Sequence, residues 1–365
     1  DKEEAVKYIK MGADHGNLNS IRNYIIILHK KPSPDKQEEL KYLKMGIDRG
    51  DDQCMNGYSY MLYNGELVES DKDDVVKYLT MAVNRGNTVA MLSYGSLLYK
   101  GDGVEMDKEK AIKIFKMGSD RGNKDCMYYL AQALYNKGQI EEASKYYKMA
   151  ADNGHVEAMS NYAAYIFVGN GIPANREEGK KYFMMAIDKG NVEAMYYYAM
   201  LLFNIEKSKI DEALKYFIKG AENGHVECMK YCAKILSEGN GVPLNKVDAL
   251  KYFKMAADNG DADSMNNYAE MIFKADGVPM NKEEGIKYFR MAAEKGDTNA
   301  LYNYGEILFK GNGIIKNEKE AVECIKKSAE LENPKAMYFY ATLLEEGKYV
   351  DLDKDLAIKY YIKSS

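Results

Sequence analysis

The stretch KYFKMAADNG at residues 251–260 recurs along the chain with few changes. Close copies are KYFRMAAEKG at 287–296, KYFMMAIDKG at 181–190 and KYYKMAADNG at 145–154. The glycine that closes this decamer returns after intervals between 32 residues, from Gly122 to Gly154, and 36 residues, from Gly260 to Gly296. The other members of the series are Gly16, Gly50, Gly86, Gly190 and Gly224, with Glu332 in the tenth place. A near-constant period along a whole chain is typical of a repeat architecture.

Each repeat predicts two helices, helix A directly after the repeat glycine and helix B in the decamer that precedes the next one. We number positions from this glycine, so that position 4 is the fourth residue after it and position −4 the fourth before it. Position 4 is always small and position 12 is always Leu or Ile, from Leu28 to Leu344. Positions 4, 5, 8, 9, 11 and 12 fall on one broad face of a helix. Helix A must therefore be covered from more than one side.

A helix pair of this kind cannot bury its apolar surface alone, so neighbouring copies must cover it. The predicted fold class is all-α, an α/α solenoid with the right-handed superhelix usual for such arrays, built from about ten helix pairs of ~36 residues. We expect a single array over residues 1–365. It comprises a leading helix B at 1–16 and repeats at 17–50, 51–86, 87–122, 123–154, 155–190, 191–224, 225–260, 261–296, 297–332 and 333–365.

Composition limits the possible partners and the compartment. With 51 basic and 56 acidic residues the net charge is −5, which argues against binding to a nucleic-acid backbone. No apolar run approaches the ~20 residues that span a bilayer, so no direct membrane span is expected. Five cysteines, an odd number that does not follow the repeat, weakly favour a reducing, intracellular compartment. Because the chain begins inside a repeat, we expect a fragment, with flanking domains or end-to-end self-association at uncapped ends.

Two stretches carry the most specific sequence pattern. SYGSLLYKGDGVEMDKEKAIKIFKMGSDRG at 93–122 and KYCAKILSEGNGVPLNKVDALKYFKMAADNG at 230–260 each join a helix, a Gly-x-Gly-Val loop and a second helix with small residues before its glycine. This pattern resembles the Sel-one-like repeat family, a branch of the tetratricopeptide-like repeats. The resemblance extends over the whole chain, although repeats 123–154 and 191–224 have shorter loops without Gly-x-Gly. It implies an adaptor that holds partner proteins.

Several residues could carry chemistry, and each has a structural alternative. The tyrosines, 32 in all, are concentrated at positions 8 and −8, which face the core, so packing is favoured over base stacking. Cys228 and Cys232 share a helix face as metal ligands would, but they fill regular core positions. His155 and His225 stand where Asn or Asp usually follows the repeat glycine, which indicates a helix N-terminus rather than catalysis. No nucleophile elbow, zinc-protease helix or Walker loop is present. We therefore predict no enzyme, no cofactor and no metal.

An acidic residue occupies position 3 in five successive repeats. The five are Asp125, Glu157, Glu193, Glu227 and Asp263. They could form an acidic ladder for a basic partner, or they could stabilise the first turn of helix A through its dipole. The two roles are compatible.

Positions 3, 6, 7, 10 and 14 of helix A lie outside the apolar face and vary between repeats. In tetratricopeptide-like arrays such positions line a concave groove. We predict that a protein or peptide partner binds there through Tyr and Asn side chains, which combine contact area with hydrogen bonding. The candidates are Asn56, Tyr128, Tyr129, Asn161, Tyr196, Tyr197, Lys230, Tyr231, Asn266, Asn267, Tyr302 and Asn303.

Three alternatives to this groove stay open. The variable positions could be no more than a solvated polar face. The array could instead be a structural spacer in a larger protein or complex, which contacts partners through its convex face or its ends. A weak hydrolase, as proposed for some secreted family members, is less favoured.

Overall fold

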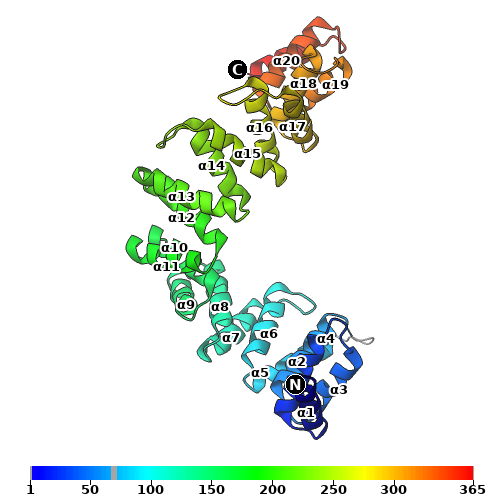
Figure 1. Cartoon of the computed structure of the whole chain (residues 1–365), viewed down its shortest axis with the longest axis vertical. Coiled ribbons are helices and arrows are strands. Elements are labelled where there is room, and N and C mark those ends of the chain that lie inside the picture. The colour runs from blue at the N-terminus through cyan, green and yellow to red at the C-terminus, as the bar shows by residue number, and fades with distance from the viewer. Residues whose placement is uncertain (1, 67–71, 365) are drawn as a thin grey trace. The chain divides into compact units, whose positions relative to one another are not determined.

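The computed structural model describes residues 2–66 and 72–364, and every regular element within them is helical (Figure 1). The chain divides into two compact units, Asp1–Lys189 and Gly190–Ser365. In the first unit the A helices are α2 (Leu18–His29), α4 (Asp52–Tyr63), α6 (Thr88–Lys100), α8 (Lys124–Asn136) and α10 (Val156–Val168). Its B helices are α1 (Lys2–Asp14), α3 (Lys36–Asp48), α5 (Lys72–Asn84), α7 (Lys108–Asp120), α9 (Ile140–Asp152) and α11 (Arg176–Asp188).

The second unit repeats the same alternation. Its A helices are α12 (Val192–Ile205), α14 (Val226–Glu238), α16 (Ala262–Lys274), α18 (Thr298–Lys310) and α20 (Pro334–Glu346). Its B helices are α13 (Ile210–Glu222), α15 (Lys246–Asp258), α17 (Lys282–Glu294), α19 (Glu318–Glu330) and α21 (Lys354–Ser364). A short 3₁₀ helix, η1 (Lys207–Lys209), replaces the longer loop between α12 and α13.

Within each unit a helix packs against its neighbours along the chain. α6 contacts both α5 and α7, and it also reaches α8, the next helix A. This stacking of helix pairs confirms the all-α solenoid class. That the repeats form one continuous array stays a prediction, because the two units are described separately.

The repeat glycine and the residue after it join helix B to the next helix A. Gly50 has a φ of +77°, and its N–H donates to the carbonyl of Ile47 at 2.8 Å. The N–H of Asp51 donates to the carbonyl of Gly46 at 2.9 Å, which completes a Schellman motif. The Asp51 carboxylate accepts the N–H of Cys54 at 2.8 Å and caps α4. One dipeptide therefore ends one helix and starts the next.

Helices B and A meet at positions −4 and 4, where the sizes of the side chains are matched. A Cβ added to Gly118 would lie 2.4 Å from the Sγ of Cys126, closer than real contacts allow. Where position −4 is alanine, position 4 is alanine in four repeats, as with the fully buried Ala150 and Ala158, and serine in one, Ser264 after Ala256. Gly12 with Ser20, Gly46 with Cys54 and Gly220 with Cys228 are further glycine pairs. Because the combined size stays small, the two helices can approach closely.

The hydroxyl groups of the core tyrosines donate hydrogen bonds to carboxylates near the surface. Tyr162 donates to Glu178 at 3.0 Å, and Lys148 donates to the same carboxylate at 2.6 Å. Tyr182 packs edge-on against Tyr162 and donates to Asp152 at 2.5 Å. Equivalent groups are Lys10, Tyr24, Glu38, Tyr42 and Asp14, and Lys254, Tyr268, Glu284, Tyr288 and Asp258. The predicted core position of these tyrosines is confirmed, and the hydroxyl bonds explain why tyrosine stands there rather than phenylalanine.

The matched pair at positions −4 and 4 gives a first prediction. Gly118→Ala should lower the free energy of unfolding by about 1 kcal/mol or more through overpacking against Cys126, although alanine favours a helix over glycine. The double variant Gly118→Ala/Cys126→Ala recreates the Ala150–Ala158 pair and should recover most of the loss. Urea unfolding of the parent, both single variants and the double variant measures the coupling. Simple additivity of the two single effects would contradict matched packing.

The carboxylates in the tyrosine groups make stability depend on pH. The hydrogen bond from Lys148 holds the pKa of Glu178 below its ordinary value. Such a carboxylate stabilises the fold above its unfolded pKa of about 4.3. This contribution is lost as the pH falls through the lower, folded pKa. Glu178→Gln should therefore reduce the melting temperature by a few degrees at neutral pH, and the difference from the parent should shrink below about pH 4.

Circular-dichroism melting curves across this pH range test the expectation. Glu177→Gln, an exposed neighbour on the same helix, serves as the matched control and should behave like the parent. A difference between Glu178→Gln and the parent that stays constant into strong acid would refute the role of the ionised carboxylate.

Candidate functional site

The variable positions of helix A, positions 3, 6, 7, 10 and 14, form a surface on each unit that we call the helix-A face. Two pockets lie on it. The first has a volume of about 640 Å³ and lies across α2, α4 and α6 of the first unit. The second has a volume of about 490 Å³ and is lined mainly by α14 and α16 of the second unit. The two differ in chemistry.

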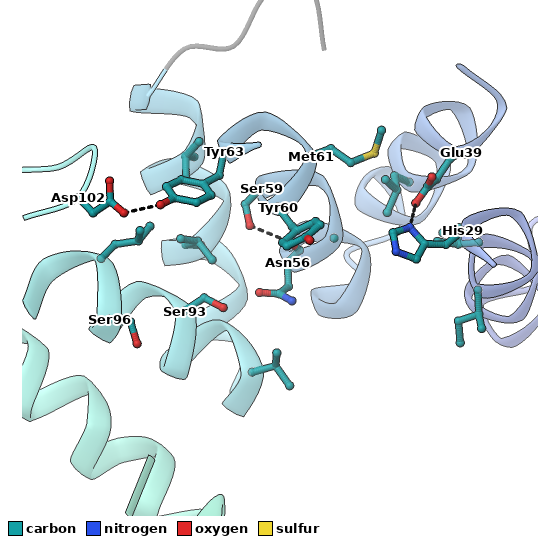
Figure 2. A pocket seen from close by; sticks show the side chains of 18 of the residues that line it. His29, Glu39, Asn56, Ser59, Tyr60, Met61, Tyr63, Ser93, Ser96 and Asp102 are labelled. Carbon is teal, nitrogen blue, oxygen red and sulfur yellow. Dashed lines mark hydrogen bonds and ion pairs between the residues drawn. The ribbon is translucent and has the colours of Figure 1, made fainter. Parts of the chain in front are cut away.

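The first pocket, which we call the apolar pocket, exposes large apolar side chains from three successive A helices (Figure 2). Ile26 is 50 % exposed, Tyr60 is 55 % exposed and Val89 is 52 % exposed. Ile26 and Tyr60 are equivalent residues at position 10, and Val89 stands at position 3 of the following repeat. The helix-A pattern therefore brings them to one surface.

In the apolar pocket a polar pair lies on each side of Tyr60 (Figure 2). At one end the carboxylate of Glu39, itself 4 % exposed, lies 3.3 Å from the Nδ1 of His29. At the other end the hydroxyl of Tyr63 donates to the carboxylate of Asp102. Both carboxylates thus already have a partner within the pocket wall.

In two other repeats an aromatic side chain at position 7 fills the corresponding space. Tyr129 of α8 stacks on Phe115 of α7, with ring centroids 5.8 Å apart. Tyr231 of α14 stacks on Phe217 of α13, with centroids 4.9 Å apart and the planes within 6° of parallel. Position 7 thus covers position −7 of the preceding helix B.

The apolar pocket opens where position 7 is smaller than the tyrosine, phenylalanine or asparagine of the other repeats. Position 7 is Gly57 in α4 and Ser93 in α6, and the residues at position −7 beneath them are Leu43 and Leu79. All four line the pocket. Of the residues predicted to bind a partner, only Asn56 lies here. The pocket was missed, although the small residues at position 7 in these two repeats could have indicated it.

The second pocket, which we call the polar pocket, contains three predicted residues, Lys230, Tyr231 and Asn267. The Nζ of Lys230 lies 3.1 Å from a carboxylate oxygen of Glu227 and 3.2 Å from one of Asp261. Lys230 therefore belongs to an ion-pair network within the wall, and its charge is already balanced.

Asp261 is the N-cap of α16, and its partner Lys230 stands at position 6 of the preceding helix A. The first repeat has the same arrangement. The Nε of Arg22, at position 6 of α2, donates at 2.7 Å to Asp51, the N-cap of α4. Burial disfavours the ionised form of Asp51, but hydrogen bonds from Arg22 and Cys54 outweigh it and lower its pKa. A cation at position 6 thus supports an acidic cap in the next repeat.

A second matched combination pairs tyrosine at position 6 with histidine at the next N-cap. Tyr128 stacks on His155 with centroids 4.3 Å apart, and Tyr196 stacks on His225 at 4.8 Å. The Nδ1 of each histidine accepts a backbone N–H of its own helix at 3.2 Å. The predicted position of both histidines at a helix N-terminus is therefore confirmed. Burial lowers the pKa of His155, which favours the neutral form that capping requires.

Asp297 shows what happens without such a partner. It caps α18, but the residue at position 6 before it is Asn266 rather than a cation. Burial raises the pKa of Asp297, and the nearby carboxylates of Asp263 and Asp261 add to the effect. The pKa values of Asp51 and Asp297 therefore shift in opposite directions, because position 6 is a cation, Arg22, in one repeat and the neutral Asn266 in the other.

The remaining predicted residues differ in how accessible they are. Tyr197 is 47 % exposed, whereas Asn266 is 3 % exposed and accepts a hydrogen bond from Asn303 at 2.9 Å. Tyr302 donates to Glu306 at 3.3 Å, and Asn161 is half-buried. Asn266 and Asn303 thus support each other across two repeats. Partner binding by the predicted set stays a prediction.

The acidic residues at position 3 and the cysteines have structural surroundings. All five acidic residues lie in the first turn of an A helix, as predicted. Asp125 lies 3.6 Å from the Nε2 of His155, and Glu193 lies 3.5 Å from that of His225. Cys228 is fully buried, and burial raises its pKa to about 12, so the interpretation as a core residue is confirmed.

The pairing of position 6 with the next cap can be tested by matched substitution. Arg22→Asn should lower the free energy of unfolding by about 1–3 kcal/mol, because it leaves the buried carboxylate of Asp51 without its cation. The same substitution in an Asp51→Asn background should cost much less, since the chain itself combines Asn56 at position 6 with an Asn87 cap. Chemical unfolding of the four proteins gives the coupling. Equal costs in both backgrounds would rule the pairing out.

Comparison with known proteins identifies the family to which these repeats belong. Ten segments match the family model for the Sel1 repeat, namely residues 1–17, 52–87, 88–123, 124–155, 156–191, 192–225, 226–261, 262–297, 298–333 and 334–365. Residues 18–51, which hold α2 and α3, lie outside the matched segments. None of the curated proteins compared matches the sequence. Among the described residues, no helix is both long and apolar enough to cross a bilayer.

Two solved structures are similar over most of their length. A protective antigen of uropathogenic Escherichia coli strains, which displays an SLR fold, has 23 % sequence identity and a TM-score of 0.66. The alignment covers 100 % of this chain and 80 % of that one. A Sel1 repeat protein from Oxalobacter formigenes has 19 % identity and a TM-score of 0.51, with coverage of 92 % and 89 %. At these identities the likeness shows the fold alone. The family match, however, extends over most of the chain, and this protein belongs to the Sel1 repeat family.

Proposed function

We propose that this protein is a non-catalytic scaffold that holds a protein or peptide partner on its helix-A face. One observation carries the proposal. The apolar pocket and the polar pocket both lie on positions that vary between repeats, beside core positions that hardly change. A surface that varies over a fixed framework suits recognition, because side chains there can change without loss of packing.

Exposed aromatic side chains add to this support. Tyr197 and Tyr338 are 47 % and 58 % exposed on helices α12 and α20, at positions 7 and 6. Tyrosine supplies a large contact area and a hydrogen bond at low entropic cost, which is why it is enriched where proteins bind each other. Asn267 adds an amide in the polar pocket.

The chemistry of the chain favours binding of a protein or peptide over catalysis and over binding of nucleic acid. Burial raises the pKa of the Cys126 and Cys228 thiols to about 12, so both are poor nucleophiles near neutral pH. A net charge of −5 disfavours a polyphosphate partner. A protein or peptide partner fits the mixed apolar and amide character of the helix-A face.

A second candidate is a structural spacer that contacts its partners through the B helices. It is favoured by exposed apolar side chains on that side, such as Met149 of α9 and Val247 of α15, which are 44 % and 65 % exposed. The two candidates predict contacts on different helices and can be separated by position-specific cross-linking.

Photo-cross-linking from matched positions tests the proposed function. A photoreactive phenylalanine analogue is placed at Tyr197 or Tyr338 on A helices, or at Met149 or Val247 on B helices, where exposure is comparable. In extracts of cells that express the protein natively, we expect discrete cross-linked species from the A positions and few from the B positions. Mass spectrometry identifies the partners. Cross-links confined to the B positions would favour the spacer and refute the helix-A face.

A further inference from the structure

We propose that the apolar pocket of α2, α4 and α6 binds a peptide segment that has an aliphatic or aromatic anchor flanked by acidic residues. This inference rests on the proposed function, since it names a site and a partner chemistry on the helix-A face. It goes beyond that function because the pocket shares only Asn56 with the residues that the repeat pattern favours.

The apolar anchor follows from the pocket wall. Ile26, Tyr60 and Val89 expose about half of their surface around a volume of about 640 Å³. A cavity of this size is in the range that accommodates one or two large side chains of a ligand. Contact between this apolar wall and water is unfavourable, so the transfer of an apolar side chain from water into the pocket lowers the free energy.

The space exists because position 7 is smallest in two repeats, and position −7 beneath it is leucine rather than an aromatic residue. Gly57 and Ser93 stand at position 7, where Tyr129 and Tyr231 cover the preceding helix B elsewhere in the chain. An incoming apolar side chain would take the place of the missing ring. The ligand's anchor would thus make the same kind of contact that Tyr129 and Tyr231 make within the protein.

The acidic flanks follow from the charges at the rim. Lys30 and Lys100, both at position 14, are exposed and line the pocket. Within the part of the chain that the structure describes, neither forms an ion pair. The pocket's carboxylates are engaged, Glu39 with His29 and Lys36, and Asp102 with the Tyr63 hydroxyl (Figure 2). Because the Tyr63 hydroxyl is neutral, Asp102 keeps its negative charge, but the two lysines without an ion pair outnumber it. The rim is therefore complementary to Asp or Glu beside the anchor, on a chain that is acidic overall.

A selection experiment on the full chain tests this proposal. A library of random peptides displayed on phage is selected against the parent protein and, in parallel, against Ser93→Tyr, which restores the aromatic residue at position 7. Enriched peptides are synthesised with a fluorescent label, and fluorescence anisotropy measures their affinity. We expect an apolar centre with acidic flanks, and at least about a tenfold weaker affinity for Ser93→Tyr, the effect of about 1.4 kcal/mol of lost contact.

Matched variants distinguish the pocket from general effects. Lys113→Tyr adds a tyrosine on the exposed surface of α7, outside the pocket and the helix-A face, and should leave affinity unchanged. Lys30→Glu/Lys100→Glu should weaken acidic-flanked peptides and favour the same peptides with lysine flanks, whereas Lys113→Glu/Lys116→Glu on α7 should do neither. Melting curves of each variant confirm that it is folded.

Several outcomes would overturn the inference. These are selection of no peptide, selection of basic-flanked peptides by the parent, or equal affinity for the parent and Ser93→Tyr. A dimer that dissociates in Ser93→Tyr during analytical ultracentrifugation would assign the pocket to a second copy instead. If peptides bind but cross-link only at Tyr197, this proposal fails while the scaffold function stands.

Discussion

The close approach of helix B to the next helix A is the contact on which the rest of the structure depends. It requires that the two side chains at positions −4 and 4 are small together, as in Gly118 with Cys126 and Ala150 with Ala158. Only then can the left-handed glycine and the capping residue after it join the helices across two residues. The tyrosines at positions 8 and −8 fill the space that this approach leaves, and their hydroxyl groups reach carboxylates at the surface. The register of one helix pair thus sets that of the next.

Several variable residues of the helix-A face are not available to a partner, because they contact the N-cap of the next repeat. Arg22 and Lys230 hold acidic caps, whereas Tyr128 and Tyr196 cover histidine caps. In these four repeats the residue at position 6 therefore matches the cap of the following repeat, so variation there does not by itself indicate a ligand. Positions 7 and 10, which are further from that cap, are better candidates for recognition. Tyr128 and Tyr196 are therefore explained by contacts between successive repeats and are weaker evidence for a binding surface.

At the apolar pocket the proposed binding site and close packing require different residues at the same position. An aromatic residue at position 7 adds buried contact with helix B, as Tyr231 does on Phe217. Gly57 and Ser93 give up that contact and leave apolar surface exposed to water, which costs stability unless a partner covers it. The apolar pocket thus lies partly on α2 and α3, which are outside the segments matched by the family.

The sequence by itself determined the period, both helices of each repeat, the buried tyrosines and the histidines at helix N-termini. These features depend on residues within one repeat, where spacing along the chain fixes spacing in the helix. Only the tertiary structure decided which variable residues are committed to a neighbour and where the surface is hollow. Tyr128 meets His155, and Ser93 fails to cover Leu79, only after helix pairs have stacked. The reason is physical. Side chains from different helices meet at distances that depend on how closely the helices pack, and a period along the chain does not contain that information.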